Sequence, residues 1–554
     1  MLSVLLIWIF ILITTFVPGF LIVGLCGRKE GLDHFKPEDI SICGLMAVTV
    51  YGEFFSLFSG VGILCRILLL IFCLAAVFLL RKKIGAYLKE HRPGKPAAAG
   101  LAFLVLLMAY GGSRGYYHFD SDLYHGQSVR WIEEYGVVPG LANLHVRLAY
   151  NSAAFVLTAV YSFVQESGQS YHAVASFLAL LVGIGACRCF HILKDRSPRG
   201  SDLARIATLY YICNIFDEMV SPASDYFVML LFFHIVTGLL ELYEKKGALR
   251  KEAGNYAVYA LLAVFVVTVK LSAAAAVLVV LIPLYMLWKE KRFRTILRYV
   301  FGSVLIALPF MIRNYILSGR ILYPSTFPDI FRPVWKVNEG ISAGDTAYII
   351  GYGKGFTTAE AADYPLRQWF PVWWGQLGTM EKLFFAATLV SVLVWLVSLF
   401  LRKKAVIPHI VEGTVLASVL FWFVSAPLIR YGLAFLICFP FVMLGELLEI
   451  NKEKHEAWQK GRFIGCLLLL SLFLLYKGVQ LGRTVLRQIG QPYYLSQQDY
   501  GHYETEANIV DGVTIYTPLE GNQCGYEAFP SAPEIFEGLH LLGDGVGDGF
   551  CIKE

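Results

Sequence analysis

The chain consists of long apolar runs separated by short polar connections. A helix that crosses a bilayer needs about 20 mostly apolar residues, and only a helix or a closed barrel satisfies its backbone hydrogen bonds in hydrocarbon. Runs of this kind predict fourteen spanning helices, near residues 2–25, 40–60, 61–80, 98–112, 171–193, 203–220, 223–243, 255–269, 271–288, 298–313, 382–401, 405–426, 428–449 and 462–480. No positive charge precedes the first run and no small-x-small cleavage site follows it, so we expect Met1 to start the mature chain.

Lysine and arginine gather in seven of the connections, and short basic connections are typically cytoplasmic. The seven clusters are residues 27–36, 81–95, 194–205, 244–251, 289–298, 402–404 and 451–462. Fourteen spans put all seven on one side of the membrane. The segment Leu148 to Phe163 is apolar enough to be a fifteenth span, but spanning there would move the later clusters to the opposite side. It is better interpreted as a short helix that lies at, or dips into, the outer face.

This topology predicts an all-α polytopic integral membrane protein with a transmembrane domain over residues 1–480. We expect surface helices in a long first external loop, residues 113–170, and a second large external loop over residues 314–381. The remaining residues, 481–554, form an extracytoplasmic tail with one predicted strand, which we expect to be a small cap. The composition agrees, because 57% of the residues are hydrophobic and only 16% are charged.

Cysteine usage follows the same division. Nine of the eleven cysteines lie in or beside predicted spans, where a thiol is a small apolar filler. Only Cys524 and Cys551 lie in the tail, so we hypothesise that they pair in an oxidising compartment. The partner that the composition predicts is the lipid bilayer, and we expect no nucleic acid.

The most polar external stretch is YYHFDSDLYHGQ, residues 116–127, which directly follows a predicted span. It opens an amphipathic helix that Asp120 or Ser121 is expected to cap and Gly136 to end. Asp122 suits the positive first turn of that helix, so capping alone can explain either aspartate. The apolar face of the helix consists of Leu123, Tyr124, Trp131, Ile132 and Tyr135.

Asp120 has a second interpretation because of its neighbours. His118, Tyr124 and His125 surround it at the membrane rim, where a lipid-linked substrate presents its headgroup. A carboxylate in that position can act as a base or as a metal ligand. Asp120 and Asp122 form a D-x-D pair, a weak metal motif because it is frequent by chance.

Further acidic residues lie near the outer ends of later helices. Asp217 and Glu218 end one span, and Asp225 follows a proline-containing turn. Acidic residues at membrane depth are costly, so they usually face a cavity or a partner. The alternative is that Asp225 caps the next helix and that the other two reach out to water.

Three cations stand on the outer side, where the positive-inside rule disfavours them: Lys270, Arg313 and Arg430. Together they favour an anion, such as the phosphate or pyrophosphate of a lipid, since arginine offers a fork of donors and lysine a compact charge. For any single cation the alternatives are pairing with Asp120, Asp217 or Asp225, or snorkelling at a helix end.

Several of these segments carry a resemblance to known proteins. The segments are FDSDLYHGQSVRWIEEYGVVPGLANLHVRLAYNSAAF, SPASDY, TVKLSA, IRNYILSGRILYP and GNQCGYEAFP. They resemble a group of bacterial integral membrane proteins, which in turn is similar to the GT-C superfamily of membrane glycosyltransferases. That superfamily includes protein mannosyltransferases and lipid A aminoarabinose transferases. The sequence differs from the group in having Asp122 where a small residue is expected, and in lacking a second cysteine soon after Cys524.

The resemblance implies a GT-C-like domain in the bacterial cytoplasmic (inner) membrane, with its active site on the extracytoplasmic face. A catalytic acid after an early span matches Asp120, and a further acid between later spans matches Asp225. The segment Leu148 to Phe163, which does not span, is also a feature of the superfamily's first loop. The implied function is transfer of a sugar from a polyprenyl-phosphate donor to a glycan, lipid or protein acceptor, in cell-envelope glycan assembly or modification.

This function assigns a role to each candidate residue. Asp120 would be the general base, helped by His125 or Asp225. Lys270, Arg313 and Arg430 would neutralise the leaving lipid phosphate, with Asp122 and Tyr124 also binding substrate. No cofactor is certain, and a divalent cation, if one binds, would use Asp120 and Asp122. The tryptophans of the second loop can stack on sugar or anchor the loop at the interface: Trp369, Trp373 and Trp374.

Two other classes of membrane protein stay open. A flippase or transporter of lipid-linked glycans also needs outer cations, although the sequence contains no long-period repeat and no paired broken helices. A surface polysaccharide polymerase or ligase would use the same donor and differ in its acceptor.

Overall fold

The computed structural model describes every residue except 27–31, 33, 246–251, 402–405, 451–455 and 554. Each of the fourteen predicted spans falls on a helical segment. Twelve segments are long and apolar enough to cross a membrane: α1 (Leu2–Cys26), α3 (Pro37–Ser56), α4 (Ile63–Glu90), α5 (Lys95–Ser113), α10 (Val174–Ala186) continued by η3 (Cys187–Phe190) and α11 (His191–Asp195), α13 (Ser224–Glu244), η4 (Leu271–Val280) continued by α16 (Leu281–Lys289), α17 (Phe293–Ser318), α20 (Thr379–Leu401), α21 (Val406–Ser425), α22 (Ile429–Ile450) and α23 (Glu456–Gln488). The other two are shorter, α12 (Gly200–Ile215) and α15 (Ala253–Val269).

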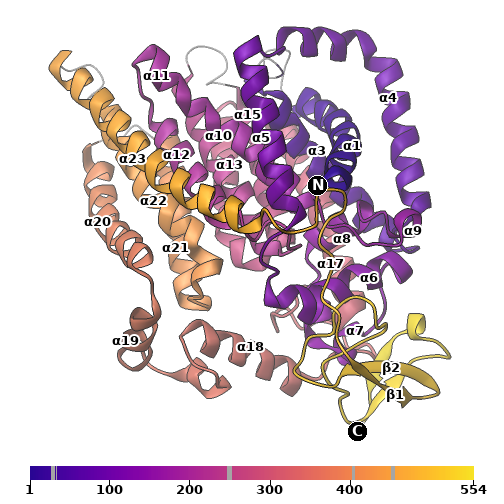
Figure 1. The fold of residues 1–554 in the computed structure, drawn as a ribbon. Coiled ribbons are helices and arrows are strands. Elements are labelled where there is room, and N and C mark those ends of the chain that lie inside the picture. The colour runs from indigo at the N-terminus through magenta and orange to yellow at the C-terminus, as the bar shows by residue number, and fades with distance from the viewer. Residues whose placement is uncertain (27–31, 33, 246–251, 402–405, 451–455, 554) are drawn as a thin grey trace.

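The protein is therefore a mostly helical, multi-pass membrane protein. The described residues contain twelve candidate spans by length and composition, and the count of fourteen stays a prediction. The helices form a bundle with two unlike ends (Figure 1). One end carries short turns, such as the one between α4 and α5. The other carries the small helices of the two long loops and the C-terminal strands. Basic clusters 27–36, 244–251, 402–404 and 451–462 lie wholly or partly outside the described residues.

The first long loop folds into six short helices. They are η1 (Ser121–His125), α6 (Gly126–Tyr135), α7 (Leu141–Leu144), η2 (Val146–Tyr150), α8 (Ala153–Val160) and α9 (Val164–Ser167). The predicted end at Gly136 is confirmed, because this glycine has a positive φ of 78° that other residues avoid. The expected cap is wrong, since η1 is a π-helix and the Asp120 side chain makes no capping hydrogen bond. Of the predicted apolar face, only Tyr135 is exposed.

The segment Leu148 to Phe163 contains a short helix, as predicted. Helix α8 has eight residues, which is too short to span a bilayer, and the Ser152 side chain caps it by accepting a hydrogen bond from the Ala154 amide. Every residue of α8 is buried, and the helix packs against α3 and α6. It is thus part of the protein core.

The second long loop contains α18 (Glu339–Gly353), η5 (Ala359–Asp363) and α19 (Leu366–Gln376). Asn338 caps α18, because its side-chain oxygen accepts from the Gly340 and Ile341 amides. Trp369 and Trp373 are buried, and Trp373 Nε1 donates to the Pro427 carbonyl oxygen at 2.6 Å. These two tryptophans fasten α19 to the turn between α21 and α22.

The tail begins after Gln488 and folds into two antiparallel hairpins, where the sequence predicted one strand. The strands are β1 (Thr505–Val510), β2 (Val513–Pro518), β3 (Leu539–Leu541) and β4 (Phe550–Ile552), paired as β1-β2 and β3-β4. The tail packs on the first loop, since the Phe550 amide donates to the Pro139 carbonyl at 2.9 Å. Cys524 and Cys551 are both buried free thiols, so the hypothesis of a disulfide between them is wrong.

Candidate functional site

Four charged residues from distant parts of the chain meet at the end of the bundle that carries the long loops. Each stands at a break between helices. Asp120 precedes η1, and Asp225 lies in the first turn of α13. Lys270 occupies the extended residue between α15 and η4, with φ −159° and ψ 127°. Arg430 begins α22 just after the end of α21. We call these four residues the charged quartet.

The quartet is a continuous chain of ion pairs. Asp120 Oδ2 lies 2.5 Å from Arg430 Nη2, and Arg430 Nε lies 3.8 Å from Asp225 Oδ2. Lys270 Nζ pairs with Asp225 Oδ1. Both cations also contact Tyr431, because Lys270 Nζ lies 3.5 Å from the ring centroid and Arg430 Nη2 donates to the hydroxyl at 3.1 Å. The alternative of internal pairing is thus confirmed for two of the three predicted cations.

Two histidines extend the quartet. His118 Nδ1 accepts from the Asp120 amide at 3.1 Å, and Arg430 Nη1 contacts His118 Nε2. The ring of His125 stacks with that of His118, with 6.5 Å between centroids. Burial lowers the pKa of His118 and lowers that of His125 to about 3, so both rings are neutral at pH 7.

Asp120 is ionised despite its burial. Burial alone would raise the pKa of this carboxyl, but the positive charge of Arg430 offsets that effect and lowers the pKa to about 2. In the resting protein Asp120 is therefore a carboxylate held by a guanidinium.

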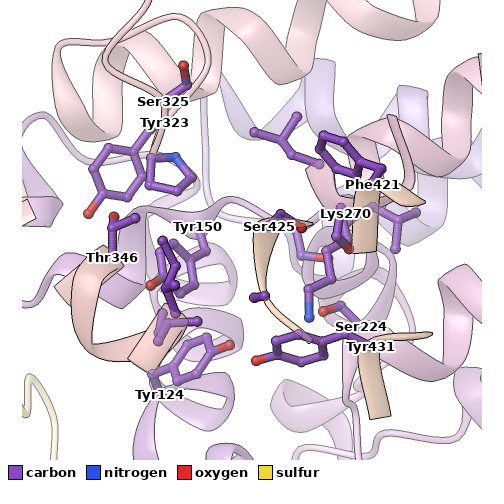
Figure 2. Close-up of a pocket in the computed structure, with 18 of the residues that line it drawn as sticks. Tyr124, Tyr150, Ser224, Lys270, Tyr323, Ser325, Thr346, Phe421, Ser425 and Tyr431 are labelled. Carbon is purple, nitrogen blue, oxygen red and sulfur yellow. The ribbon is translucent and has the colours of Figure 1, made fainter. Parts of the chain in front are cut away.

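The quartet lies between two cavities. The first has a volume of about 490 Å³ and is mostly apolar, with Lys270 reaching toward Tyr431 and Ser224 (Figure 2). Its apolar wall includes Phe155, Val269, Leu271, Phe421 and Val424. We call it the apolar cavity.

The second cavity has a volume of about 460 Å³ and is polar. Asp120, Arg430 and His118 line it together with Arg147 and Asn522. We call it the polar cavity. It shares four lining residues with the apolar cavity, namely Tyr124, Tyr150, Ile349 and Tyr431. A molecule with an apolar chain and a polar head would therefore place its junction beside the quartet.

Three predicted site residues lie elsewhere. Asp122 accepts hydrogen bonds from the Gly501 amide at 2.9 Å and the Tyr503 hydroxyl at 3.0 Å, so it binds the tail instead of facing either cavity. Residues two apart in a helix differ in direction by about 200°, which separates Asp122 from Asp120. Within the described residues, no group of three or more His, Cys, Asp or Glu side chains is arranged to hold a metal ion.

Arg313 is buried and lines neither cavity. Its guanidinium donates to Asn151 Oδ1 at 2.9 Å, to the Gly136 carbonyl at 3.3 Å and to Ser56 Oγ, which ties α17 to the first loop and α3. His125 also lies behind the cavity wall, so it contacts the quartet's surroundings without lining either cavity.

The remaining acidic residues near the predicted outer helix ends have partners close by. Asp217 pairs with Arg487 at 3.4 Å and contacts Gln488, and Glu218 accepts from the Tyr226 hydroxyl. Asp225 makes no capping hydrogen bond, because its carboxylate faces the two cations of the quartet.

Sequence reasoning missed two features of the polar cavity. Arg147 pairs with Asp345 Oδ1 at 3.0 Å, and the Tyr150 hydroxyl donates to the same carboxylate. Arg147 lies in the predicted first external loop, so the positive-inside rule that selected the three other cations would also have found it. Asn522 comes from the tail and carries no charge that could have marked it.

A family model with the description "Domain of unknown function (DUF8201)" matches residues 1–437. The chain belongs to this family. The matched region includes the whole quartet and stops before the tail that contributes Asn522. No curated protein and no solved structure matches the chain.

Proposed function

We propose that this member of the family is a GT-C-type glycosyltransferase that transfers a sugar from a polyprenyl-phosphate donor to an acceptor hydroxyl. The observation that carries the proposal is the position of the charged quartet, between an apolar and a polar cavity. An isoprenoid chain needs apolar surface, its phosphate needs cations, and its sugar needs polar partners. The apolar cavity offers the apolar surface, the quartet the cations and the polar cavity the polar partners.

The donor would enter from the membrane. Val424, in the wall of the apolar cavity, is 80% exposed and lies near the end of the candidate span α21, so we expect lipid to reach that wall. The phosphate would then bind Lys270 and Arg430. Arg430 lines the polar cavity, and among the described residues its buried Nε, 3.8 Å from Asp225 Oδ2, makes no hydrogen bond, so the guanidinium has donor capacity left for a phosphate oxygen.

Phosphate binding would also activate the base. In the resting protein the Asp120 carboxylate is a weak base, because Arg430 holds its pKa at about 2. A phosphate that shares Arg430 cancels part of this positive charge, and the pKa of Asp120 rises toward its ordinary value or above it. The base would thus gain strength only once the donor is bound.

The chemical step is a displacement at the anomeric carbon C1. The acceptor oxygen forms a bond to C1 while the bond from C1 to the phosphate oxygen breaks, and the lipid phosphate leaves with that electron pair. The acceptor proton passes to Asp120, and Lys270 and Arg430 stabilise the charge that develops on the phosphate. In this scheme the configuration at C1 inverts. The setting we propose is the extracytoplasmic face of a bacterial inner membrane, in cell-envelope glycan synthesis.

A transfer assay tests the proposal. Purified protein in nanodiscs receives labelled polyprenyl-phosphate sugar and envelope acceptors, and Asp120→Asn is compared with the unmodified chain. We expect a loss of about 10²- to 10⁴-fold, the range for removing a general base. Asp217→Asn is the matched control, since Asp217 pairs with Arg487 outside the cavities, and it should retain activity.

Two results would contradict this assignment. Undiminished transfer by Asp120→Asn would remove Asp120 from the mechanism. Label that only changes leaflet, with no new bond, would favour a flippase. Because Lys270 and Arg430 can supply the positive charge, we expect transfer to persist when EDTA removes divalent cations.

A further inference from the structure

The part of the polar cavity beyond Asp120 has a distinct composition. Tyr116, Tyr348 and Tyr352 line it with exposed fractions of 60%, 40% and 51%, and the exposed residue Asn522 adds an amide. We infer that this part of the cavity binds the acceptor and that the acceptor is a glycan. The inference rests on the proposed glycosyl transfer and specifies its second substrate.

The two tyrosines of α18 form a fixed aromatic surface. Tyr348 and Tyr352 are one helical turn apart, with rings 15° from parallel and centroids 6.4 Å apart. The carboxylate of Asp345, on the same helix, accepts from Arg147 at 3.0 Å and from the Tyr150 hydroxyl. This contact holds α18 over the cavity. Flat rings with hydroxyl groups suit a sugar, which presents a C–H face and a rim of hydroxyls.

Asn522 is held next to the catalytic loop by the backbone around it. The Cys524 and Gly525 amides both donate to the Asp122 carbonyl at 2.8 Å, and Gln523 Nε2 donates to the Phe119 carbonyl at 3.3 Å. The tail is thus bound on both sides of Asp120. A side-chain amide both donates and accepts, as a sugar hydroxyl does, so Asn522 can orient a hydroxyl toward the base.

The same cavity suits other acceptors less well. A peptide would need backbone groups to pair with, but none of the described residues that line the cavity belongs to a tail strand. A lipid acceptor would need apolar surface, which the proposed donor already occupies.

Binding and transfer are measured separately to test this inference. Saturation-transfer NMR on the full chain in nanodiscs uses three probes: a panel of gluco-, manno-, galacto- and chito-tetrasaccharides, a Ser/Thr-containing peptide, and a polyprenol. Asn522→Ala and Tyr352→Leu should each weaken tetrasaccharide binding, and raise the acceptor KM, by about ten-fold, as expected for the loss of one hydrogen bond or one stacked ring. The donor KM should stay within about two-fold, because both residues lie away from Lys270 and the apolar cavity.

Two variants serve as matched controls. Asn508→Ala removes an amide in β1 that bonds Thr517 Oγ1 at 2.9 Å, and Tyr476→Leu removes a tyrosine that is also 51% exposed but lies on α23. Neither should change glycan binding. The inference is overturned if no tetrasaccharide binds, if the peptide or the polyprenol is the better acceptor, or if both cavity variants behave like their controls. Glycan binding that depends on Asn522 without any transfer would instead contradict the proposed enzyme and leave the glycan site standing.

Discussion

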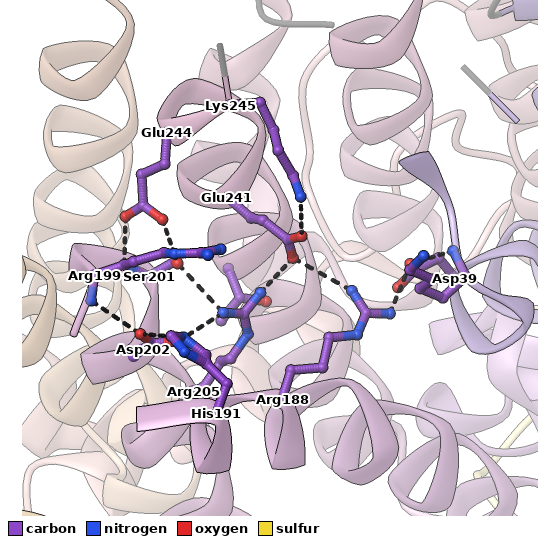
Figure 3. A network of polar contacts seen from close by, with 12 residues as sticks. Asp39, Arg188, His191, Arg199, Ser201, Asp202, Arg205, Glu241, Glu244 and Lys245 are labelled. Atoms are coloured by element: carbon purple, nitrogen blue, oxygen red, sulfur yellow. Dashed lines mark hydrogen bonds and ion pairs between the residues drawn. The ribbon is translucent and has the colours of Figure 1, made fainter. Parts of the chain in front are cut away.

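Two clusters of buried ion pairs among the described residues differ in the space that lies beside them. The charged quartet lies between two cavities of more than 400 Å³ each. The second cluster, shown in Figure 3, surrounds a space of only about 20 Å³, enough for about one water molecule. We call this second cluster the closed network and define it by Asp39, Arg188, Asp202, Arg205 and Glu241. Helix α13 joins the two clusters, because Asp225 and Glu241 lie on it about 24 Å apart along the axis.

The closed network resembles the quartet in chemistry. Arg205 pairs with Asp202 Oδ1 at 2.9 Å and with Glu241, and Arg188 pairs with Asp39 Oδ2 at 2.8 Å and with Glu241 at 3.3 Å. These contacts clamp α3, η3, α12 and α13 together. Charged residues within a membrane protein are therefore not evidence of a site in themselves. The space beside them decides whether the charges can meet a substrate.

The largest expected effect concerns the closed network, which we expect to stabilise the fold without taking part in transfer. Arg205→Met leaves Asp202 and Glu241 buried without their shared cation, so we expect a loss of about 3–5 kcal/mol of stability. Thermal unfolding in detergent measures it, and transfer per folded molecule should change by less than about two-fold, since no substrate reaches the network. Arg292→Met, which breaks a partly exposed pair with Glu290, is the control and should leave the melting temperature unchanged. An Arg205 variant as stable as this control would show that the closed network does not hold these helices together.

The second prediction concerns the quartet. Lys270→Met should reduce transfer by about 10²- to 10³-fold, the range for removing one donor to a developing anion. It should destabilise the protein less than Arg205→Met does, because Asp225 keeps a second cation, Arg430, at 3.8 Å. Transfer assays and melting curves on the same preparation test both statements. Lys382→Met, on α20 beside the Trp374 ring, serves as the control. If Lys270→Met lost stability but kept its rate, the quartet would be a second closed network.

The helical fold could be predicted from the sequence because the length of each apolar run is a local property. Helices α12 and α15 fell below the length of a typical span, since a helix buried among others need not match the bilayer. The strands of the tail were harder to predict from the sequence. Strands β3 and β4 have three residues each, too few for an alternating pattern, and β4 is held by its contact with Pro139.

The site could be predicted only where a residue breaks a rule of charge placement. In the predicted topology, Lys270 and Arg430 are outer-side cations, and Asp120 and Asp225 are acids beside spans. The same rule also selected Arg313, because the sequence does not reveal that Asn151 and Gly136 satisfy it. Neutral Asn522 breaks no such rule. Its neighbour Gln523 contacts Phe119 across 404 positions, a distance that no local pattern reveals.

A third prediction tests whether the tail is held beside the charged quartet and contributes to transfer. Asp122→Ala removes the acceptor for the Gly501 amide and the Tyr503 hydroxyl. The free energy of unfolding should fall by about 1–3 kcal/mol. Hydrogen exchange should accelerate at Gly501, and transfer should fall a few-fold as Asn522 loses its fixed position. Asp544→Ala, an exposed acid of the tail, is the control. Unchanged exchange at Gly501 would mean that the tail is held without Asp122.

The smallest expected effect is a change in pH dependence beside the quartet. Burial lowers the pKa of His125 to about 3, whereas in the unfolded chain it is about 6.5. Between these two values the unfolded chain binds about one more proton at this residue than the folded protein does, so stability falls as the pH is lowered from 6.5 toward 3. Above pH 6.5 the residue contributes no pH dependence. His125→Asn should therefore reduce the slope of unfolding free energy against pH by up to about 1.4 kcal/mol per unit in that window. The exposed His540 provides the control His540→Asn. An equal slope in both variants would show that His125 is protonated in the folded protein. Its positive charge would then have to be added to those of the quartet.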